Sequence, residues 1–65
     1  MTLKEKVALL EKARANARDV AKIYEDANDE ESAKHYRGEA EGFYTAILLL
    51  TSDRFAEKIA EIYSK

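Results

Sequence analysis

Apolar residues recur at steps of three and four through the first 27 positions, and no helix breaker interrupts them. The chain contains no proline, and its two glycines come later, at positions 38 and 42. Thr2 and Glu5 have the spacing of a capping box, in which each side chain accepts a hydrogen bond from the other residue's backbone N–H. The sequence therefore predicts a helix over 3–27 that buries one stripe against another helix. The apolar members of this stripe are Leu3, Leu10, Ala13, Ala17, Val20, Tyr24 and Ala27. Lys6 is the one polar residue at a stripe position.

A second apolar stripe begins after a short polar interruption at 26–29. Asn28 or Asp29 is suited to cap the next helix, because a short side-chain oxygen can accept hydrogen bonds from its open N–H groups. Glu30 and Glu31 then place negative charge at the positive end of the helix dipole. The short connection predicts antiparallel helices over 3–27 and 29–51. The second stripe comprises Ala33, Tyr36, Ala40, Phe43, Ile47 and Leu50, and the expected facing pairs are Leu10–Ile47, Ala13–Phe43, Ala17–Ala40 and Val20–Tyr36.

The last dozen residues carry an apolar stripe that is out of phase with the one before it. Thr51, Ser52 and Asp53 favour helix ends over helix interiors, because their side chains compete for backbone donors. The downstream stripe is rotated by about 100°, which is one residue. We therefore expect a break at 51–53 and a third helix over 53–64, with one long bent helix over 29–64 as the alternative. The fold class is all-α, an antiparallel helical hairpin plus a short third helix, in a single domain of residues 1–65.

Composition limits the classes of protein open to this chain. It has 65 residues and no cysteine, so it forms one small domain without a disulfide or a thiolate zinc site. Its formal net charge of −2 gives no general attraction to nucleic acid or anionic lipid. The longest apolar run, at 46–50, is far shorter than the roughly 20 residues that span a bilayer. We expect a cytoplasmic protein that does not interact with membranes.

The predicted hairpin has apolar residues outside its seam, the line of contact along which the two stripes face each other. Leu48 and Leu49 lie off the seam, as do Leu9 and Ile23, and exposed apolar patches commonly mark interfaces. We therefore expect a homo-oligomer, a twofold dimer forming a helical bundle; the alternative is a three-helix monomer that covers this surface itself. The residues expected at the oligomer or partner interface are Gly38, Gly42, Leu48, Leu49, Phe55, Ile59 and Ile62.

Gly38 and Gly42 need a reason, because glycine inside a helix costs roughly 1 kcal/mol relative to alanine. They lie one turn apart on the face opposite the seam. Three interpretations stay open for this pair: a close contact with another helix or subunit, a tolerated softening of the helix, and a ligand groove.

The second predicted helix also carries a short recognisable pattern. Residues 35–49 contain the pattern Tyr-x-Gly-x-x-x-Gly-aromatic-x-x-Ala-aliphatic. This pattern resembles the second helix of small uncharacterised helical proteins encoded by phages and prophages of Gram-positive bacteria. The likeness covers about a quarter of the chain. It implies an origin, and it brings no activity and no residue role with it.

Catalytic and metal-binding chemistry finds little support in the sequence. His35 is the one histidine, and Glu31 and Glu39 lie on adjoining turns of the same face. Di-iron bundles instead use a Glu-x-x-His spacing on two helices. We interpret these three side chains as part of a charged, solvent-exposed helix face, on which residues four positions apart contact each other. The serines lie at helix caps or termini, where their hydroxyls have a structural role, His35 is the one possible base, and no glycine-rich phosphate loop is present. We therefore expect no enzyme activity, no cofactor and no metal.

Arg14, Arg18 and Lys22 form a basic ridge on the first predicted helix, at successive steps of four residues. Like charges at this spacing repel, so partners are expected. The register offers Glu39 and Glu41 for an ion-pair network, and phosphate groups are the alternative partners. The sequence thus favours a non-enzymatic accessory or regulatory protein that self-associates and docks another protein. The alternative is a small nucleic-acid-associated regulator that uses this ridge.

Overall fold

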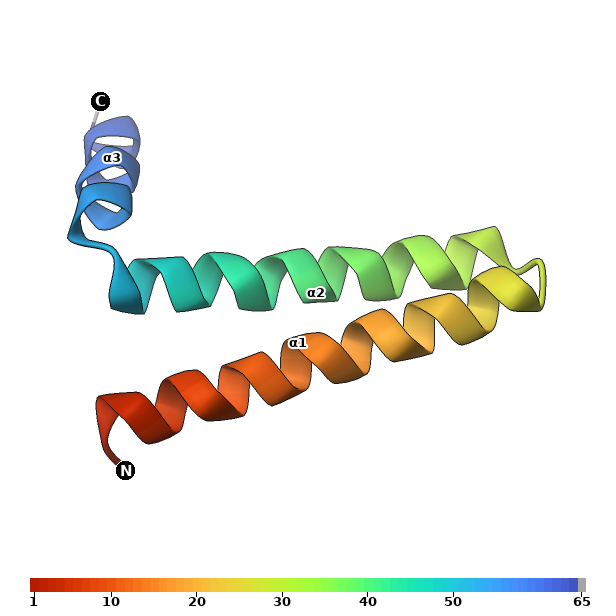
Figure 1. The fold of residues 1–65 in the computed structure, drawn as a ribbon. Coiled ribbons are helices and arrows are strands. Elements are labelled where there is room, and N and C mark those ends of the chain that lie inside the picture. Colours follow the sequence, from red (N-terminus) through yellow and green to blue (C-terminus); the bar gives the residue numbers. More distant parts are fainter. Residues whose placement is uncertain (65) are drawn as a thin grey trace.

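The structure, a computed structural model, describes residues 1–64. It contains three helices, α1 (Leu3–Asp26), α2 (Glu30–Thr51) and α3 (Asp53–Tyr63) (Figure 1). α1 and α2 pack as an antiparallel hairpin, and α3 packs against α2. The predicted all-α hairpin with a short third helix is confirmed, and each helix begins and ends within one residue of its predicted bound.

Side-chain capping explains where the hairpin begins and turns. The Thr2 N–H donates to Glu5 Oε1 at 3.0 Å and the Glu5 N–H donates to Thr2 Oγ1 at 3.1 Å, which is the predicted capping box. At the turn, Asn28 adopts a positive φ of 60°, a conformation that asparagine tolerates better than most residues. The N–H of Asn28 donates to Glu25 O and that of Asp29 to Tyr24 O, which closes α1 with a Schellman motif.

Of the two residues suited to cap α2, the structure uses Asp29. Its Oδ1 accepts from the Ser32 N–H at 3.1 Å and its Oδ2 accepts from the Ser32 hydroxyl at 2.8 Å. Asn28 instead supplies the left-handed residue of the turn. The two neighbouring polar residues therefore have different functions in the same connection.

Ser52 separates α2 from α3, so the alternative of one long bent helix is wrong. Its backbone is extended (φ −126°, ψ 106°). Its N–H donates to Leu48 O at 2.9 Å, at the end of α2, and its Oγ accepts from the Phe55 N–H at 3.1 Å, at the start of α3. One residue thus ends one helix and caps the next, and these hydrogen bonds define the direction in which α3 leaves.

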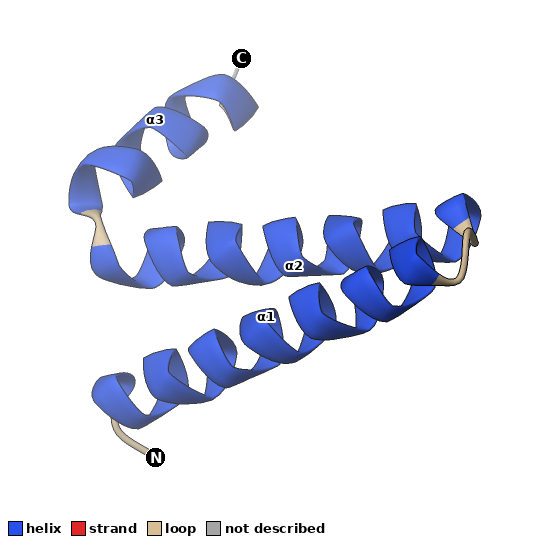
Figure 2. Cartoon of the chain, turned by 45° about the vertical axis from the view of Figure 1, so that its right-hand side comes forward, coloured by secondary structure: helices blue, strands red, loops and turns tan. Residues whose placement is uncertain are grey.

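The hairpin seam is narrow near the turn and wide at the other end. Both views show α1 and α2 diverging from the turn toward the N-terminus of α1 (Figures 1 and 2). Small side chains at the seam allow two helices to approach closely. The buried apolar residues of positions 1–64 are four alanines and one isoleucine: Ala17, Ala21, Ala33, Ala40 and Ile47. Tyr36 stacks on Tyr24 with ring centroids 5.6 Å apart, one turn nearer the connection than the predicted partner Val20.

The three helices form a single layer. The molecule measures 40 × 32 × 14 Å, and its smallest dimension is close to the ~10–12 Å diameter of one helix. Its Cα radius of gyration is 14.3 Å, whereas a compact domain of this length would have about 11 Å. Within residues 1–64, therefore, neither broad face of the hairpin is covered by another helix (Figure 2).

Candidate functional site

Most of the exposed large apolar side chains gather at one end of the molecule. We call this the open end: the start of α1, the end of α2 and all of α3, which lie together on the left in Figure 1. Seven of the nine such side chains in residues 1–64 belong to it: Met1, Leu3, Leu9, Leu49, Leu50, Ile62 and Tyr63. The other two, Ile23 and Tyr44, lie elsewhere on the hairpin. Exposed apolar surface of this kind is typical of an interface.

The seam itself is incomplete at the open end. Leu3 and Leu50 both belong to the predicted seam stripes, yet they are 53% and 43% exposed. The two helices diverge toward this end, so the first turn of α1 and the last turn of α2 stand apart (Figure 1). α3 does not fill the space, because α2 is the only helix among the described residues against which it packs.

The predicted interface residues fall into two separate groups. Leu49 and Ile62 are exposed at 43% and 60%, and the remaining three at the open end are half-buried: Leu48, Phe55 and Ile59. Gly38 and Gly42 lie midway along α2, away from this group, and both are exposed. A Cβ atom at either glycine would meet no atom within 4 Å. The chain's own fold therefore gives no reason for these glycines.

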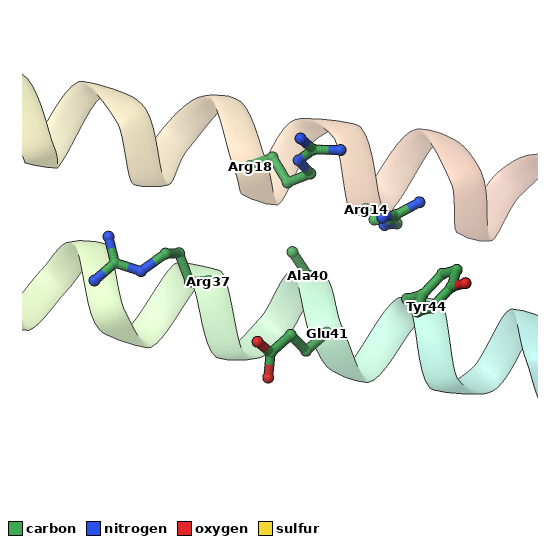
Figure 3. A pocket seen from close by; sticks show the side chains of 6 residues that line it. All are labelled: Arg14, Arg18, Arg37, Ala40, Glu41 and Tyr44. Carbon is green, nitrogen blue, oxygen red and sulfur yellow. The ribbon is translucent and has the colours of Figure 1, made fainter.

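A groove of about 210 Å³ runs between the middles of α1 and α2 (Figure 3). The Arg14 guanidinium lies over the Tyr44 ring, 4.4 Å from its centroid, a cation–π geometry. Lys22, the third residue of the predicted basic ridge, does not line this groove. The lining residues are Arg14, Arg18, Arg37, Ala40, Glu41 and Tyr44. The ridge is thus divided, with two of its three cations at a groove and the third on the outer surface.

The expected ion pairs between the ridge and Glu39 or Glu41 are wrong. In the part of the chain that the structure describes, the interhelical ion pair joins Arg37 of α2 to Glu25 of α1, and Arg37 also pairs with Glu30 of its own helix. The hydrogen bonds that Arg37 donates to these carboxylates, Glu30 first and Glu25 second, raise the pKa of Arg37 above its ordinary value. Arg37 therefore fastens the turn end of the hairpin, while Arg14 and Arg18 have no carboxylate partner among residues 1–64.

His35 lies on a solvated face, as predicted. Its Nε2 is 3.7 Å from Glu39 Oε2, one turn along α2, and its ring meets Tyr36 edge-on with centroids 5.1 Å apart. Residues 1–64 contain no group of three or more side chains placed to hold a metal ion. None of the described helices has both the length and the apolar character that crossing a membrane requires.

Sequence reasoning missed Arg37 and Tyr44 as members of the groove. The signal for Tyr44 was present, because Arg14 and Tyr44 face each other in the predicted register to within one residue. Arg37 was harder to find, since its partner Glu25 sits at the turn, where the connection changes the register.

Comparison of the chain with protein-family models, with curated proteins and with solved structures gave no match.

Proposed function

We propose that this chain is a non-enzymatic helical interaction protein that self-associates through its open end and presents the resulting bundle to another protein. The observation that carries the proposal is its surface area of 5386 Å². A compact monomer of 7.4 kDa would expose about 4,200 Å². The surplus of roughly 1,200 Å² exceeds the ~800 Å² that each partner contributes to a standard protein interface.

The small core of the single chain supports the same proposal. The buried apolar residues of positions 1–64 are four alanines and Ile47, and no large side chain there is completely buried. A single core in a chain of this length rarely supplies more than ~3–5 kcal/mol even when well packed. Packing the open ends of two copies together would bury the leucines and isoleucines that a stable core needs, at roughly 25 cal/mol per Å² of apolar surface.

Self-association predicts that the thermal midpoint rises with protein concentration, because mass action stabilises a folded oligomer. We expect such a rise for the wild-type chain across about a hundredfold range of concentration. Leu49→Glu should abolish it, since a charge would enter the apolar contact. Ile23→Glu is the matched control, because Ile23 is also an exposed apolar residue but lies near the turn; its midpoint should keep the wild-type dependence. A wild-type midpoint independent of concentration would refute the proposal.

A second candidate function, binding to nucleic acid, is favoured by one observation: Arg14 and Arg18 border the same groove without a carboxylate partner in residues 1–64. Phosphate contacts would neutralise them, and the affinity would then fall steeply with salt. The test is a titration of labelled DNA and RNA duplexes at low salt. Binding that weakens with salt and is lost in Arg18→Gln would support this function, and the absence of binding would exclude it.

A further inference from the structure

We propose that α3 is an exchanged arm: the apolar stripe of α3 in one copy packs against the incomplete seam at the open end of a second copy, and the reverse contact forms at the same time. This inference rests on the proposed self-association and specifies its geometry. The occupant of the open end is therefore the α3 helix of another copy of this chain.

The receiving surface is the end of the seam at which α1 and α2 diverge. Leu3 and Leu50 are seam residues that remain about half exposed, and Val7, one turn after Leu3, is only half-buried. The first turn of α1 and the last turn of α2 stand apart at this end (Figure 1). A third helix laid across this end would complete the packing of both helices, in the way that facing stripes complete a bundle.

The chain's own α3 does not take this place. The extended backbone of Ser52 and its two hydrogen bonds, to Leu48 O and from the Phe55 N–H, direct α3 away from α1. Figures 1 and 2 both show α3 on the far side of α2 from α1. A one-residue connection leaves little freedom to reverse this direction, since the last turn of α2 and the first turn of α3 flank it directly.

α3 is itself a helix with an unfilled apolar face. Phe55, Ile59 and Ile62 follow one another at steps of four and three, while Glu57, Lys58 and Glu61 occupy the opposite side. The two residues nearest Ser52 on this stripe, Phe55 and Ile59, are half-buried by α2. Exposure then rises along the helix, to 60% at Ile62 and 82% at Tyr63. The end of α3 thus projects apolar side chains with no partner among the described residues.

A second copy fits both surfaces better than an unrelated partner. The chain offers an incomplete seam and an unpartnered stripe, and Ser52 keeps the two from meeting within one subunit. A twofold axis brings each stripe to the other copy's seam, so two equal contacts form and neither surface is left over. The surplus area of roughly 1,200 Å² per chain is sufficient for an interface of this kind.

Because the chain lacks cysteine, single cysteines can report which segments meet across the interface. We would prepare Lys6→Cys, at the polar position of the α1 seam stripe near the open end, and Ala60→Cys, on the flank of the α3 stripe; both residues are exposed. The two variants are mixed and treated with a short bis-maleimide crosslinker. We expect the mixed Lys6→Cys/Ala60→Cys product to dominate over either homotypic product. Ala27→Cys, exposed at the turn, is the control partner and should give little product with Ala60→Cys.

The outcomes separate this inference from the proposed self-association. Sedimentation of the uncrosslinked variants establishes whether they self-associate, and circular dichroism establishes that each is helical. If the variants self-associate but Ala60→Cys links mainly to itself, or no product forms, α3 is not inserted in the partner's seam and the inference fails alone. If wild type and variants are all monomeric, both the inference and the proposed function fail.

Discussion

The two ends of this hairpin are built from different side chains, and the difference accounts for the shape of the molecule. Near the turn, Ala21 and Ala33 are buried to 2% and 0% exposure, and small seam residues bring the helices close together. At the open end the seam residues Leu3 and Leu50 stay partly exposed, and the two helices stand farther apart (Figure 1). One end is therefore complete within the chain, whereas the other requires further apolar surface.

Charge follows the same division. Residues 25–31 near the turn contain five acidic side chains and no basic one, and Arg37 pairs with two of them, Glu25 and Glu30. The open end has few unbalanced charges: α3 has three acidic and two basic residues in Asp53–Tyr63. An acidic turn disfavours contact between two turn ends, because like charges repel, which agrees with the proposal that copies associate through the apolar end.

Enlarging a side chain at the complete end is expected to have the largest effect. Ala33→Leu would insert three carbon atoms where no space is accessible, at a cost of about 1–3 kcal/mol in the free energy of unfolding. Ala15→Leu is the control, since Ala15 is exposed on α1 and surface changes usually stay within about 0.5 kcal/mol. Urea denaturation of the two variants measures the difference. Equal stabilities would mean that the alanine seam is not closely packed.

Replacing the glycines of α2 by alanine should change the stability by a smaller amount and in the opposite direction. Gly38→Ala and Gly42→Ala should each stabilise the chain by roughly 0.5–1 kcal/mol, because alanine is the better helix former and a Cβ would meet no atom within 4 Å. Thermal unfolding at fixed concentration measures the gain. A loss of self-association in these variants would instead place the glycines in a subunit contact, and would move the interface toward the middle of α2.

Removing the ionic contacts at the turn should have a modest effect that depends on salt. Arg37→Gln ends the pairing with Glu25 and Glu30, which are exposed, so salt should screen the contribution. We expect a lower melting temperature than wild type at low ionic strength and a reduced difference in 1 M salt. Arg54→Gln in α3 is the control, since Arg54 forms no ion pair within residues 1–64. A difference unaffected by salt would show that Arg37 acts through packing.

The smallest effect is expected at the N-terminus of α1. Hydrogen bonds with Thr2 lower the pKa of Glu5 below its usual 4.5, and the bond from the Thr2 backbone N–H has a larger effect than the one that involves the Thr2 side chain. A lowered carboxyl pKa stabilises the folded state above the unfolded pKa, and this contribution is lost as pH falls through the folded value. The first turn should therefore fray in acid below about pH 4.5. Amide exchange at Glu5 measures this, and Glu5→Gln should remove the pH dependence.

Local signals were sufficient to predict the helices and the hairpin. Thr2 and Ser52 can each satisfy backbone groups at a helix end, so their positions gave the helix bounds to within a residue. Apolar spacing identified the seam and placed Ala17 and Ala40 on it, where both are buried.

The angle between the helices could not be predicted in this way, because it depends on the combined volumes of side chains along the whole seam. The stacking of Tyr36 on Tyr24 and the exposure of Leu3 and Leu50 were therefore not predicted. The groove around Arg14 and Tyr44 likewise depends on how far apart two helices lie, which spacing along each helix does not specify. The exposed surface at the open end was expected from the surplus of leucines, but its division between an incomplete seam and the stripe of α3 required the structure.

The most direct test of whether the open end brings two copies together is the molar mass of the wild-type chain in solution, measured by multi-angle light scattering at tens of micromolar. We expect about twice the chain mass of 7.4 kDa, falling toward the single-chain value on dilution or in Leu49→Glu. A mass of one chain at every concentration, with a stable and cooperatively folded protein, would contradict the central claim.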